Sequence, residues 1–340
     1  MKVARDIGID LGTANILVYL KGKGIVIREP SVVAVNRHTG EVLAVGNPAK
    51  KMLGRTPASI VSVRPIRDGV IADYDMAEKL IRYVLKKAQS AAGVGKSNII
   101  ISVPSGVTEV EYMAVEQAAE KAGAKRHPIL FEEPVLAAIG AGIDLKESNG
   151  SMVVDIGGGT AEVAVLSAGG VVLCKSIRAA GDALDEAIVN YVKRERSLLI
   201  GELTAEEIKC TIGAAYPKPQ EEYMEIKGRD LKTGLPKNIK ITSSEVGEAI
   251  AEPVNTIIAA IKESLEETPP ELAADVMDRG IMLTGGGALL SGFDRRIKIE
   301  TGISVTIAEN PLDCVALGAG KCLSDVALRR LIYRNRNMGV

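Results

Sequence analysis

The stretch that decides the fold is IGIDLGTANILVYL, residues 7–20, because a closely similar pattern returns at residues 152–166, MVVDIGGGTAEVAVL. Each segment is an apolar run followed by Asp, an aliphatic residue, Gly and small polar residues, and then a second apolar run. Apolar runs that flank such a turn predict a β-hairpin. The repeat therefore predicts a chain built from two similar halves, each of which opens with a hairpin.

The composition indicates a globular protein, and its balanced charge gives no sign of nucleic-acid binding. Of the 340 residues, 46% are apolar, and 42 Lys and Arg stand against 43 Asp and Glu. The balance gives no argument for nucleic acid as a partner. Two His and four separate cysteines without a CxxC pair argue against zinc and indicate free thiols in a reducing cytoplasm: Cys174, Cys210, Cys314 and Cys322. We expect no signal peptide and no membrane span.

Strand-like and helical periods alternate along the chain, which predicts an α/β fold with helices that cover sheets. In the helix predicted from residue 74, one face collects Ala77, Leu80, Ile81, Val84, Leu85 and Ala88. We expect two domains packed around a cleft, joined near residues 144–150. The segment MEIKGRDLKTGLPKNIKIT, residues 224–242, predicts a two-stranded excursion.

The first hairpin has the residues of a phosphate site. Its turn carries one Gly and two side-chain donors: Gly12, Thr13, Ala14 and Asn15. Successive backbone N–H groups in such a turn bind anions, and Gly permits a close approach. Asp10, at the strand end, could hold Mg²⁺ through water. The alternative for this hairpin alone is an ordinary β-turn capped by an Asp.

The second hairpin strengthens the phosphate interpretation. Three glycines precede a hydroxyl, in the run Gly157, Gly158, Gly159 and Thr160. Consecutive glycines cost conformational entropy, so something must approach this backbone closely. Two such hairpins could hold a phosphate chain from opposite sides, with Asp10 and Asp155 sharing one Mg²⁺. The two halves then form a clamp with the ligand between them.

A third glycine cluster follows the strand-like run GIMLT: Gly285, Gly286, Gly287 and then Ala288. A strand, glycines and a helix predict a nucleotide contact, in which the helix N-terminus supplies a positive dipole end. A tight strand-to-helix turn is the alternative. Neither a GxxxxGK[ST] motif nor a GxGxxG after a strand occurs, so P-loop and Rossmann folds are disfavoured.

Together these motifs resemble the actin/Hsp70/sugar-kinase superfamily and, within it, the MreB family of bacterial actins. The resemblance runs from about residue 5 to residue 322 and rests on IDLGTAN, RPIRDGVIADY, EEPVLAAIGAG, VVDIGGGTAEVAVLS, GRDLKTGLPK and LTGGGALL. It implies an actin-like duplicated α/β fold, with a mixed sheet flanked by helices in each of two domains around a nucleotide cleft. Domain I would span 1–145 plus about 311–340, with a small excursion at about 33–72. Domain II would span 146–310, with an insertion at about 182–245.

The resemblance implies bound ATP and Mg²⁺, slow hydrolysis and filament assembly. The residues that match the catalytic positions are Glu133, Asp155 and Thr160, and Asp10 and Asp155 match the metal-organising acids. Glu133 would position the attacking water, and its place before Pro134 at a helix start suits that role; helix capping is the alternative. Glu132 is a lesser candidate.

The adenosine contacts implied by the resemblance are Glu206, Glu207, Ile208 and Lys209, together with a closing loop, Gly285 to Ala288. Glu206 and Lys209 lie three apart on one helix face, so an exposed salt bridge between them is the alternative. The family further implies head-to-tail protofilaments paired antiparallel, a place at the inner surface of the cell membrane, a role in cell-wall synthesis and rod shape, and the membrane partners RodZ and MreC.

Three departures from the family pattern leave questions open. Ala161 replaces a Thr, so we expect one hydroxyl fewer near the γ-phosphate; binding should survive, and the hydrolysis rate stays an open question. The N-terminus lacks an amphipathic helix, and the loop SAAGVGKSN has only Val94 at its tip. Lipid contact could instead come from the basic tail, with Arg329, Arg330, Arg334 and Arg336 beside Leu331, Ile332 and Tyr333; a frayed, solvated end is the alternative.

Two other functions are compatible with the same clamp. A small-molecule kinase would need an acceptor pocket and a base for a substrate hydroxyl, and no further acidic motif demands one. The ATPase part of an Hsp70-type chaperone would be followed by a substrate-binding domain, for which the 340 residues leave no room. The filament-forming ATPase is therefore the preferred hypothesis.

Overall fold

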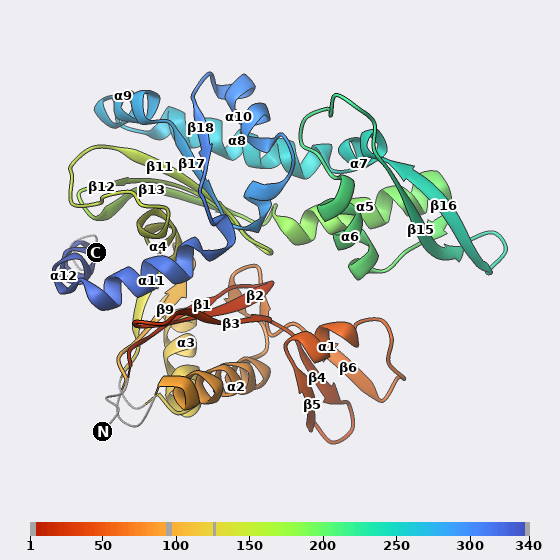
Figure 1. Cartoon of the computed structure of the whole chain (residues 1–340), viewed down its shortest axis with the longest axis horizontal. Coiled ribbons are helices and arrows are strands. Elements are labelled where there is room, and N and C mark those ends of the chain that lie inside the picture. Colours follow the sequence, from red (N-terminus) through yellow and green to blue (C-terminus); the bar gives the residue numbers. More distant parts are fainter. Residues whose placement is uncertain (1–4, 93–96, 125–126, 337–340) are drawn as a thin grey trace.

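The computed structural model describes residues 5–92, 97–124 and 127–336, and its centre is formed by two five-stranded sheets (Figure 1). The first sheet has the strand order β10-β9-β1-β2-β3. The strands β1, β2 and β3 pair antiparallel, whereas β9 is parallel to both β1 and β10. In chain order these strands are β1 Ile7–Leu11, β2 Asn15–Leu20, β3 Gly24–Pro30, β9 Ile99–Val103 and β10 Ile129–Glu132.

The second sheet repeats the topology of the first. Its order is β13-β12-β11-β17-β18, again with an antiparallel three-stranded part followed by two parallel strands. Its strands are β11 Ser151–Ile156, β12 Ala161–Ser167, β13 Gly170–Ile177, β17 Ile281–Thr284 and β18 Val305–Ile307. The repeated motif in the sequence is therefore the β1–β2 hairpin in one sheet and the β11–β12 hairpin in the other.

Helices cover the outer faces of both sheets. On the first sheet, the predicted apolar face of α2 is confirmed, because all six of its residues are at most 1% exposed. The outer helices are α2 Tyr74–Ala92, α3 Glu109–Lys121, α5 Gly181–Arg196, α8 Ala251–Glu267, α9 Pro270–Arg279 and α10 Phe293–Thr301. Each sheet thus has its own hydrophobic core on its outer side.

Two helices, α4 Glu133–Gly140 and α11 Cys314–Ser324, lie between the sheets and join the halves (Figure 1). They belong to one apolar cluster with side chains of β9, β11 and β12. Their backbones touch where two glycines meet the facing helix. A Cβ on Gly140 would lie 1.8 Å from the Cys314 carbonyl oxygen, and one on Gly318 would lie 1.9 Å from that of Leu136.

Two smaller parts lie at the same end of the molecule, on the right in Figure 1. The first holds the three-stranded sheet β5-β4-β6 and the hairpin β7–β8. Its elements are β4 Val33–Asn36, β5 Val42–Val45, α1 Asn47–Lys51, β6 Ile60–Val63, β7 Ile66–Arg67 and β8 Val70–Ile71. The second holds the sheet β14-β15-β16, with β14 Leu198–Leu199, α6 Glu202–Ile212, β15 Tyr223–Asp230, β16 Pro236–Thr242 and α7 Ser243–Ala249. The predicted two-stranded excursion is β15 and β16.

The basic C-terminal segment is a helix, α12 Val326–Arg336, and not a frayed end. Ile332 is 5% exposed and packs in the cluster between the sheets, so the expectation that it inserts into lipid is wrong. Tyr333 is exposed, and the side chains of Arg334 and Arg336 lie outside the described residues. The loop tip with Val94 also lies outside them. In the described part of the chain, no helix combines the length and the apolar character needed to cross a membrane.

Candidate functional site

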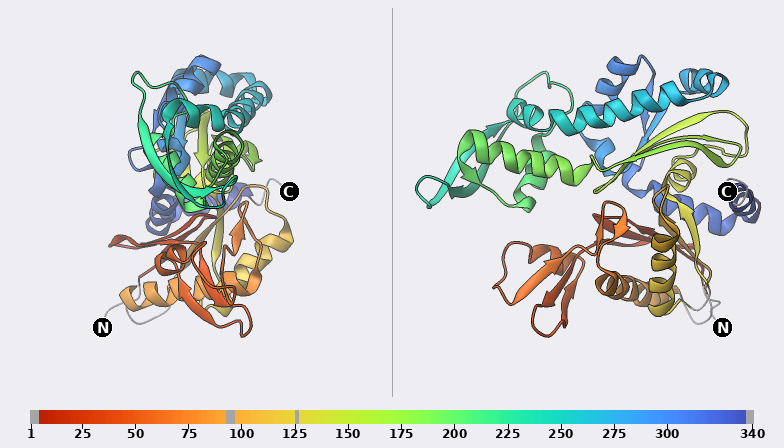
Figure 2. Two further views of the ribbon diagram at one scale, coloured as in Figure 1. Left: turned by 90° about the vertical axis from the view of Figure 1, so that its right-hand side faces the viewer. Right: turned by 180° about the vertical axis from the view of Figure 1, so that it is seen from behind.

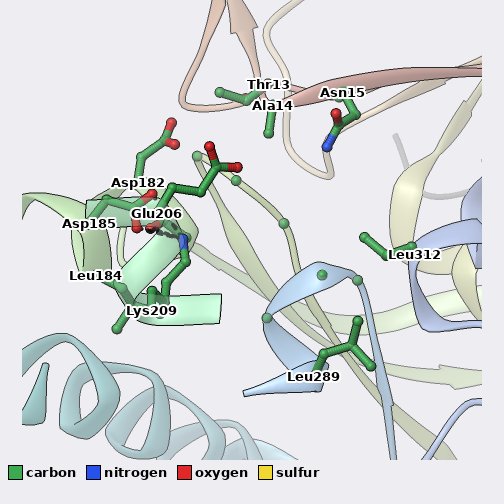
Figure 3. Close-up of a pocket in the computed structure, with 18 of the residues that line it drawn as sticks. Thr13, Ala14, Asn15, Asp182, Leu184, Asp185, Glu206, Lys209, Leu289 and Leu312 are labelled. Carbon is green, nitrogen blue, oxygen red and sulfur yellow. Dashed lines mark hydrogen bonds and ion pairs between the residues drawn. The ribbon is translucent and has the colours of Figure 1, made fainter. Parts of the chain in front are cut away.

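A cavity of about 430 Å³ opens between the two halves, a size that is ordinary for small-ligand sites. Both hairpins contribute to its lining, and Figure 3 shows them with α5, α6 and the loop after β17. The predicted site residues that line it are Asp10, Gly12, Thr13, Ala14, Asn15, Glu133, Asp155, Gly157, Gly158, Gly159, Thr160, Glu206, Lys209, Gly285, Gly286 and Gly287. Side chains that are up to 277 positions apart in sequence thus share one space.

The turns of the two hairpins meet at the cavity. A Cβ on Gly158 would lie 2.5 Å from the Ala14 Cβ, and one on Gly159 would lie 2.8 Å from the Thr13 Oγ1. The sequence argument attributed this run of glycines to the approach of a ligand. For these two positions the group that approaches is the opposite hairpin of the protein itself, which only glycine can accommodate.

A third turn, which the sequence analysis missed, joins the hairpins. Asp68 and Gly69 link β7 to β8, and both have positive φ angles, 49° and 77°. Two positive φ values in a two-residue connection are typical of a type I′ hairpin turn, and the dipeptide Asp-Gly favours it. The Gly69 N–H donates to the Thr13 hydroxyl at 3.0 Å. The signal was present in the sequence as RDGV, but nothing local shows where this turn lies.

Three carboxylates gather at the strand ends below the hairpin turns. Asp10 and Asp155 are the penultimate residues of β1 and β11, and Glu133 begins α4. The buried Ser102 hydroxyl lies 3.3 Å from Asp10 Oδ1 and 3.5 Å from Glu133 Oε1, so it can donate to either. The Thr284 hydroxyl donates to Asp155 Oδ1 at 2.9 Å.

Burial and mutual repulsion raise the pKa values of these acids. Burial, then the neighbouring Asp155, raises the pKa of Asp10 to about 7. Burial raises the pKa of Asp155 to about 6, although its bond from Thr284 opposes the shift. Burial, then Glu162, Asp10 and Asp155, raises the pKa of Glu133 well above its usual value. A cluster of buried carboxylates with raised pKa values favours the binding of a cation between them.

The carboxylates can serve as part of a metal site in which other ligands complete the coordination. Among the described residues, no group of three or more His, Cys, Asp or Glu side chains could hold a metal ion. Asp10 and Asp155 could therefore contribute to a Mg²⁺ site only together with water and phosphate oxygens, which is the manner in which Mg²⁺ commonly binds.

The opposite wall of the cavity carries charged side chains of α5 and α6 (Figure 3). Lys209 Nζ lies 2.9 Å from Asp185 and donates to the Gly181 carbonyl at 2.8 Å. Glu206 pairs at 2.7 Å with Lys50 of α1. The alternative of a salt bridge between Glu206 and Lys209 is therefore wrong, because each side chain has a different partner.

The loop after β17 is placed as predicted, but the helix behind it is not. Gly285 has φ 77°, and a Cβ there would lie 2.3 Å from the Ile156 carbonyl oxygen. The segment that follows is a 3₁₀ turn, Gly286–Leu289, and α10 begins only at Phe293. The expected α-helix N-terminus is thus absent from this loop. Leu289 and Leu312, which are 58% and 50% exposed, form an apolar rim instead.

Three predicted contact residues are not among the described residues that line the cavity. Ile208 and Ala288 are fully buried in the core of the second half, and Glu207 is exposed on α6. Ala161 is also fully buried in that core. Its position in the core therefore does not support the expectation of a missing hydroxyl near the γ-phosphate.

Two basic residues that the sequence analysis did not select connect the smaller parts across the mouth of the cavity. Arg64 lies 2.9 Å from Asp182 of α5 and 3.4 Å from Glu202 of α6. Lys50 makes the contact with Glu206 described above. These pairs hold the excursion of the first half against the cavity-lining helices α5 and α6 of the second. Cys210 also lines the rim and is exposed.

We expect Asp155→Asn to stabilise the nucleotide-free protein at pH 8 by about 3 kcal/mol, at about 1.4 kcal/mol per pKa unit. Because the pKa of Asp155 is raised from 3.8 to about 6, the folded state binds this proton more tightly than the unfolded state. Stability therefore falls as the pH rises from about 4 to about 6, and the full cost remains above that range. Urea unfolding in EDTA at pH 8 and pH 4 measures the difference.

The gain should be much smaller at pH 4, where the carboxyl group is protonated in the folded state and partly protonated in the unfolded state. Glu207→Gln, a matched change at an exposed carboxylate, should alter stability by less than about 0.5 kcal/mol at either pH. A variant that is less stable than the wild type at pH 8 would contradict the assigned environment of Asp155.

The comparisons with known proteins agree with this architecture. The family model described as MreB/Mbl protein matches residues 4–330. The cell shape-determining protein Mbl of Bacillus subtilis is 51% identical over 323 residues, which cover 95% of this chain and 97% of Mbl. The cell shape-determining protein MreB of Escherichia coli is 51% identical over 325 residues, 94% of this chain and 93% of that protein.

Solved structures show the same fold. MreB5 of Spiroplasma citri bound to ADP superposes with a TM-score of 0.91 at 37% identity, over 97% of this chain and 99% of MreB5. The same protein bound to AMPPNP gives a TM-score of 0.89 over the full length of both chains. The predicted actin-like duplicated fold is confirmed. The repeated hairpins, the shared cavity and these likenesses place the chain in the MreB/Mbl family of actin-like, cell shape-determining proteins.

Proposed function

We propose that this protein binds ATP with Mg²⁺, hydrolyses it slowly, and polymerises into filaments that organise cell-wall synthesis and rod shape. The observation that carries the proposal is the meeting of two glycine-rich hairpins, each with an Asp, at one cavity of about 430 Å³. A relative with the same fold, MreB5, has been solved with ADP and with AMPPNP, which supports a nucleotide as the ligand.

The phosphate chain would lie against the turns of the two hairpins. Gly12 to Asn15 and Gly157 to Thr160 line the cavity there, and backbone N–H groups of such turns can neutralise phosphate charge. The N–H of Gly157 is an exception, because it donates to the Thr160 carbonyl at 2.9 Å. Asp10 and Asp155 would hold Mg²⁺ through water. When bound, the metal would offset the charge of the phosphates and of the raised-pKa carboxylates. Glu206, Lys209 and the loop Gly285 to Gly287 would contact the adenosine.

Glu133 is the residue that we assign to the attacking water. It begins α4 at the floor of the cavity, and the Ser102 hydroxyl lies 3.5 Å from its Oε1. A carboxylate fixed on a helix at that place can orient a water molecule or accept its proton. Thr160, which is 8% exposed at the turn of the second hairpin, would contact the terminal phosphate.

Assembly and location complete the proposal. We infer that identical subunits associate head to tail and that the protofilaments pair antiparallel. The filaments would lie in the cytoplasm at the inner face of the cell membrane, with RodZ and MreC as membrane partners. The exposed part of α12, including Tyr333, remains available to contact lipid, whereas the buried Ile332 does not.

Sedimentation of the purified protein with MgATP, with phosphate release read in the same tubes, tests the proposal. We expect the protein to pellet with MgATP and to stay in solution with EDTA, because the nucleotide contacts both halves and favours the closed clamp. Absence of a pellet under all nucleotide conditions, with or without anionic vesicles, would refute the filament. The matched family and relatives give the kinase alternative no support.

A further inference from the structure

A buried glutamate that the proposed mechanism does not use lies in the strand after the turn of the second hairpin. Glu162 follows Thr160 by two positions, on β12, and is 1% exposed. It is not among the described residues that line the cavity. Its Oε2 atom is buried and, within the ranges that the structure describes, has no hydrogen-bond partner. A fully buried glutamate is unusual in proteins unless it is paired.

The burial of Glu162 is unfavourable for folding. Burial raises the pKa of its carboxyl group to about 8, and the acids Asp155 and Glu132 add to the shift, although the Ser105 N–H opposes it. The folded state therefore binds this proton more tightly than the unfolded state, so stability falls as the pH rises from about 4.5 to about 8. A leucine at this place would carry no such cost. A buried polar group that lowers stability often belongs to a functional site.

One hydrogen bond of Glu162 crosses between the two halves. Its Oε1 atom accepts the N–H of Ser105 at 2.8 Å. Glu162 belongs to the second sheet, whereas Ser105 lies in the loop that follows β9 of the first sheet. Both views of Figure 2 show the first half, largely red to orange, below the second half, largely green to blue. Separation of the halves at this place would therefore break the bond.

The loop held by this bond leaves the strand that lies between the candidate catalytic acids. In the first sheet β9 lies between β1, which carries Asp10, and β10, which Glu133 follows directly. The hydroxyl oxygen of Ser102, on β9, lies 3.3 Å from a carboxylate oxygen of Asp10 and 3.5 Å from one of Glu133. Ser105 is only three positions further along the chain. Fixing the loop at Ser105 therefore also fixes the end of β9 that carries Ser102.

The same loop and the second hairpin both pack against the β7–β8 turn. A Cβ on Gly69, in that turn, would lie 2.6 Å from the Pro104 Cγ and 3.4 Å from the Thr160 Cγ2. Glu162 is two positions from Thr160, and its hydrogen bond goes to the residue after Pro104. The loop after β9 is thus fixed by packing at Pro104 and by a hydrogen bond at Ser105.

We propose that Glu162 is a positioning residue for hydrolysis, which holds the loop after β9 across the closed clamp and so keeps Ser102 beside Glu133. Glu162 does not reach the cavity, so it acts through Ser105 and not on the nucleotide or the water. Because the bond joins the two halves, it forms only when they are closed, and hydrolysis then depends on closure. The inference deepens the proposed function and rests on it, because it concerns the same reaction.

Two variants separate the hydrogen bond from the charge. Glu162→Leu removes the acceptor, whereas Glu162→Gln removes the charge and keeps an acceptor oxygen for Ser105. In single-turnover hydrolysis of MgATP, the Leu variant should be slower than the wild type by about tenfold, the effect of one lost hydrogen bond, and the Gln variant should stay within about twofold. Both should bind a fluorescent ATP analogue with the wild-type Kd. Glu186→Leu, at an exposed position of α5, is the matched control and should change neither quantity.

Two further measurements distinguish a positioning role from a structural one. The urea midpoint of Glu162→Leu in EDTA at pH 8 should not fall below that of the wild type, because the variant removes a buried carboxylate. Ser105 is half-buried, so water can replace the lost acceptor of its N–H. Hydrogen exchange of the Ser105 amide with Mg-AMPPNP should be faster by about tenfold or more in the Leu variant and unchanged in the Gln variant. A variant that is slower but no less stable shows that Glu162 serves the reaction.

Four results would overturn the inference. If Glu162→Leu hydrolyses ATP at the wild-type rate, Glu162 has no part in the reaction. If Glu162→Gln is as slow as Glu162→Leu, the charge is required and the bond to Ser105 is not the cause. If Glu162→Leu loses nucleotide binding and unfolds at a lower urea concentration, its role is structural. If the wild type itself releases no phosphate from MgATP, the proposed function fails, and the inference fails with it.

Discussion

Replacing Glu133 by Gln reduces MgATP-dependent phosphate release by about 100-fold or more, which is the lower range for loss of a positioned general base. The amide keeps the size of the side chain and can still accept a bond from Ser102, but it cannot take a proton from water. Nucleotide binding and pelleting with MgATP should be retained, since the residue lies at the floor of the cavity and not on the hairpin turns that we propose to bind phosphate. Single-turnover hydrolysis measures the loss.

Glu132→Gln is the control for this prediction. Glu132 ends β10, directly before Glu133, and is not among the described residues that line the cavity. Its substitution should leave the hydrolysis rate within about twofold of the wild type. If Glu133→Gln hydrolyses ATP at the normal rate, the carboxylate only begins a helix, and the alternative of N-terminal capping is correct.

Gly318→Ala should destabilise the protein by about 3 kcal/mol or more, toward the upper range for overpacking. The new Cβ would lie 1.9 Å from the Leu136 carbonyl oxygen, and backbone on the facing helix is the group that must move. Because α4 and α11 join the two halves, separating them disturbs the core on both sides. The urea midpoint of the nucleotide-free protein measures the effect.

Gly201→Ala is the matched control, because nothing lies within 4 Å of a Cβ at that position and its φ of −93° suits any residue. Its cost should be at most about 1 kcal/mol, the difference between glycine and alanine at an N-cap. An unchanged midpoint for Gly318→Ala would show that the helices can separate freely. In that case the close crossing contributes little to the joint between the halves.

The hairpins and their Asp residues could be predicted because their signal is local. An apolar run, an Asp and a glycine turn are contiguous in sequence, and the repetition of the pattern indicated that the halves face each other. The contacts of Lys50 and Arg64 could not be predicted in the same way. Their partners are 156 and 118 positions away, and no local period reports such a distance.

Some errors could have been avoided from the sequence. Ile208 was grouped with Glu206 and Lys209, but residues two apart on a helix do not share a face. The Ile208 side chain is accordingly buried in the core of the second half, whereas Glu206 and Lys209 line the cavity. Ile332 is different: its burial depends on the packing of α12 against the apolar cluster that contains α4 and α11, which the basic composition of the tail does not indicate.

The exposed Cys210 at the rim of the cavity makes the natural chain suitable for fluorescence spectroscopy. Burial raises the pKa of all four thiols, and it brings those of Cys174, Cys314 and Cys322 to about 12 each. Since the thiolate is the reactive species, a maleimide dye at neutral pH should attach first to Cys210. Such a dye would sit one residue from Lys209, where its emission can report nucleotide exchange in real time without an engineered cysteine.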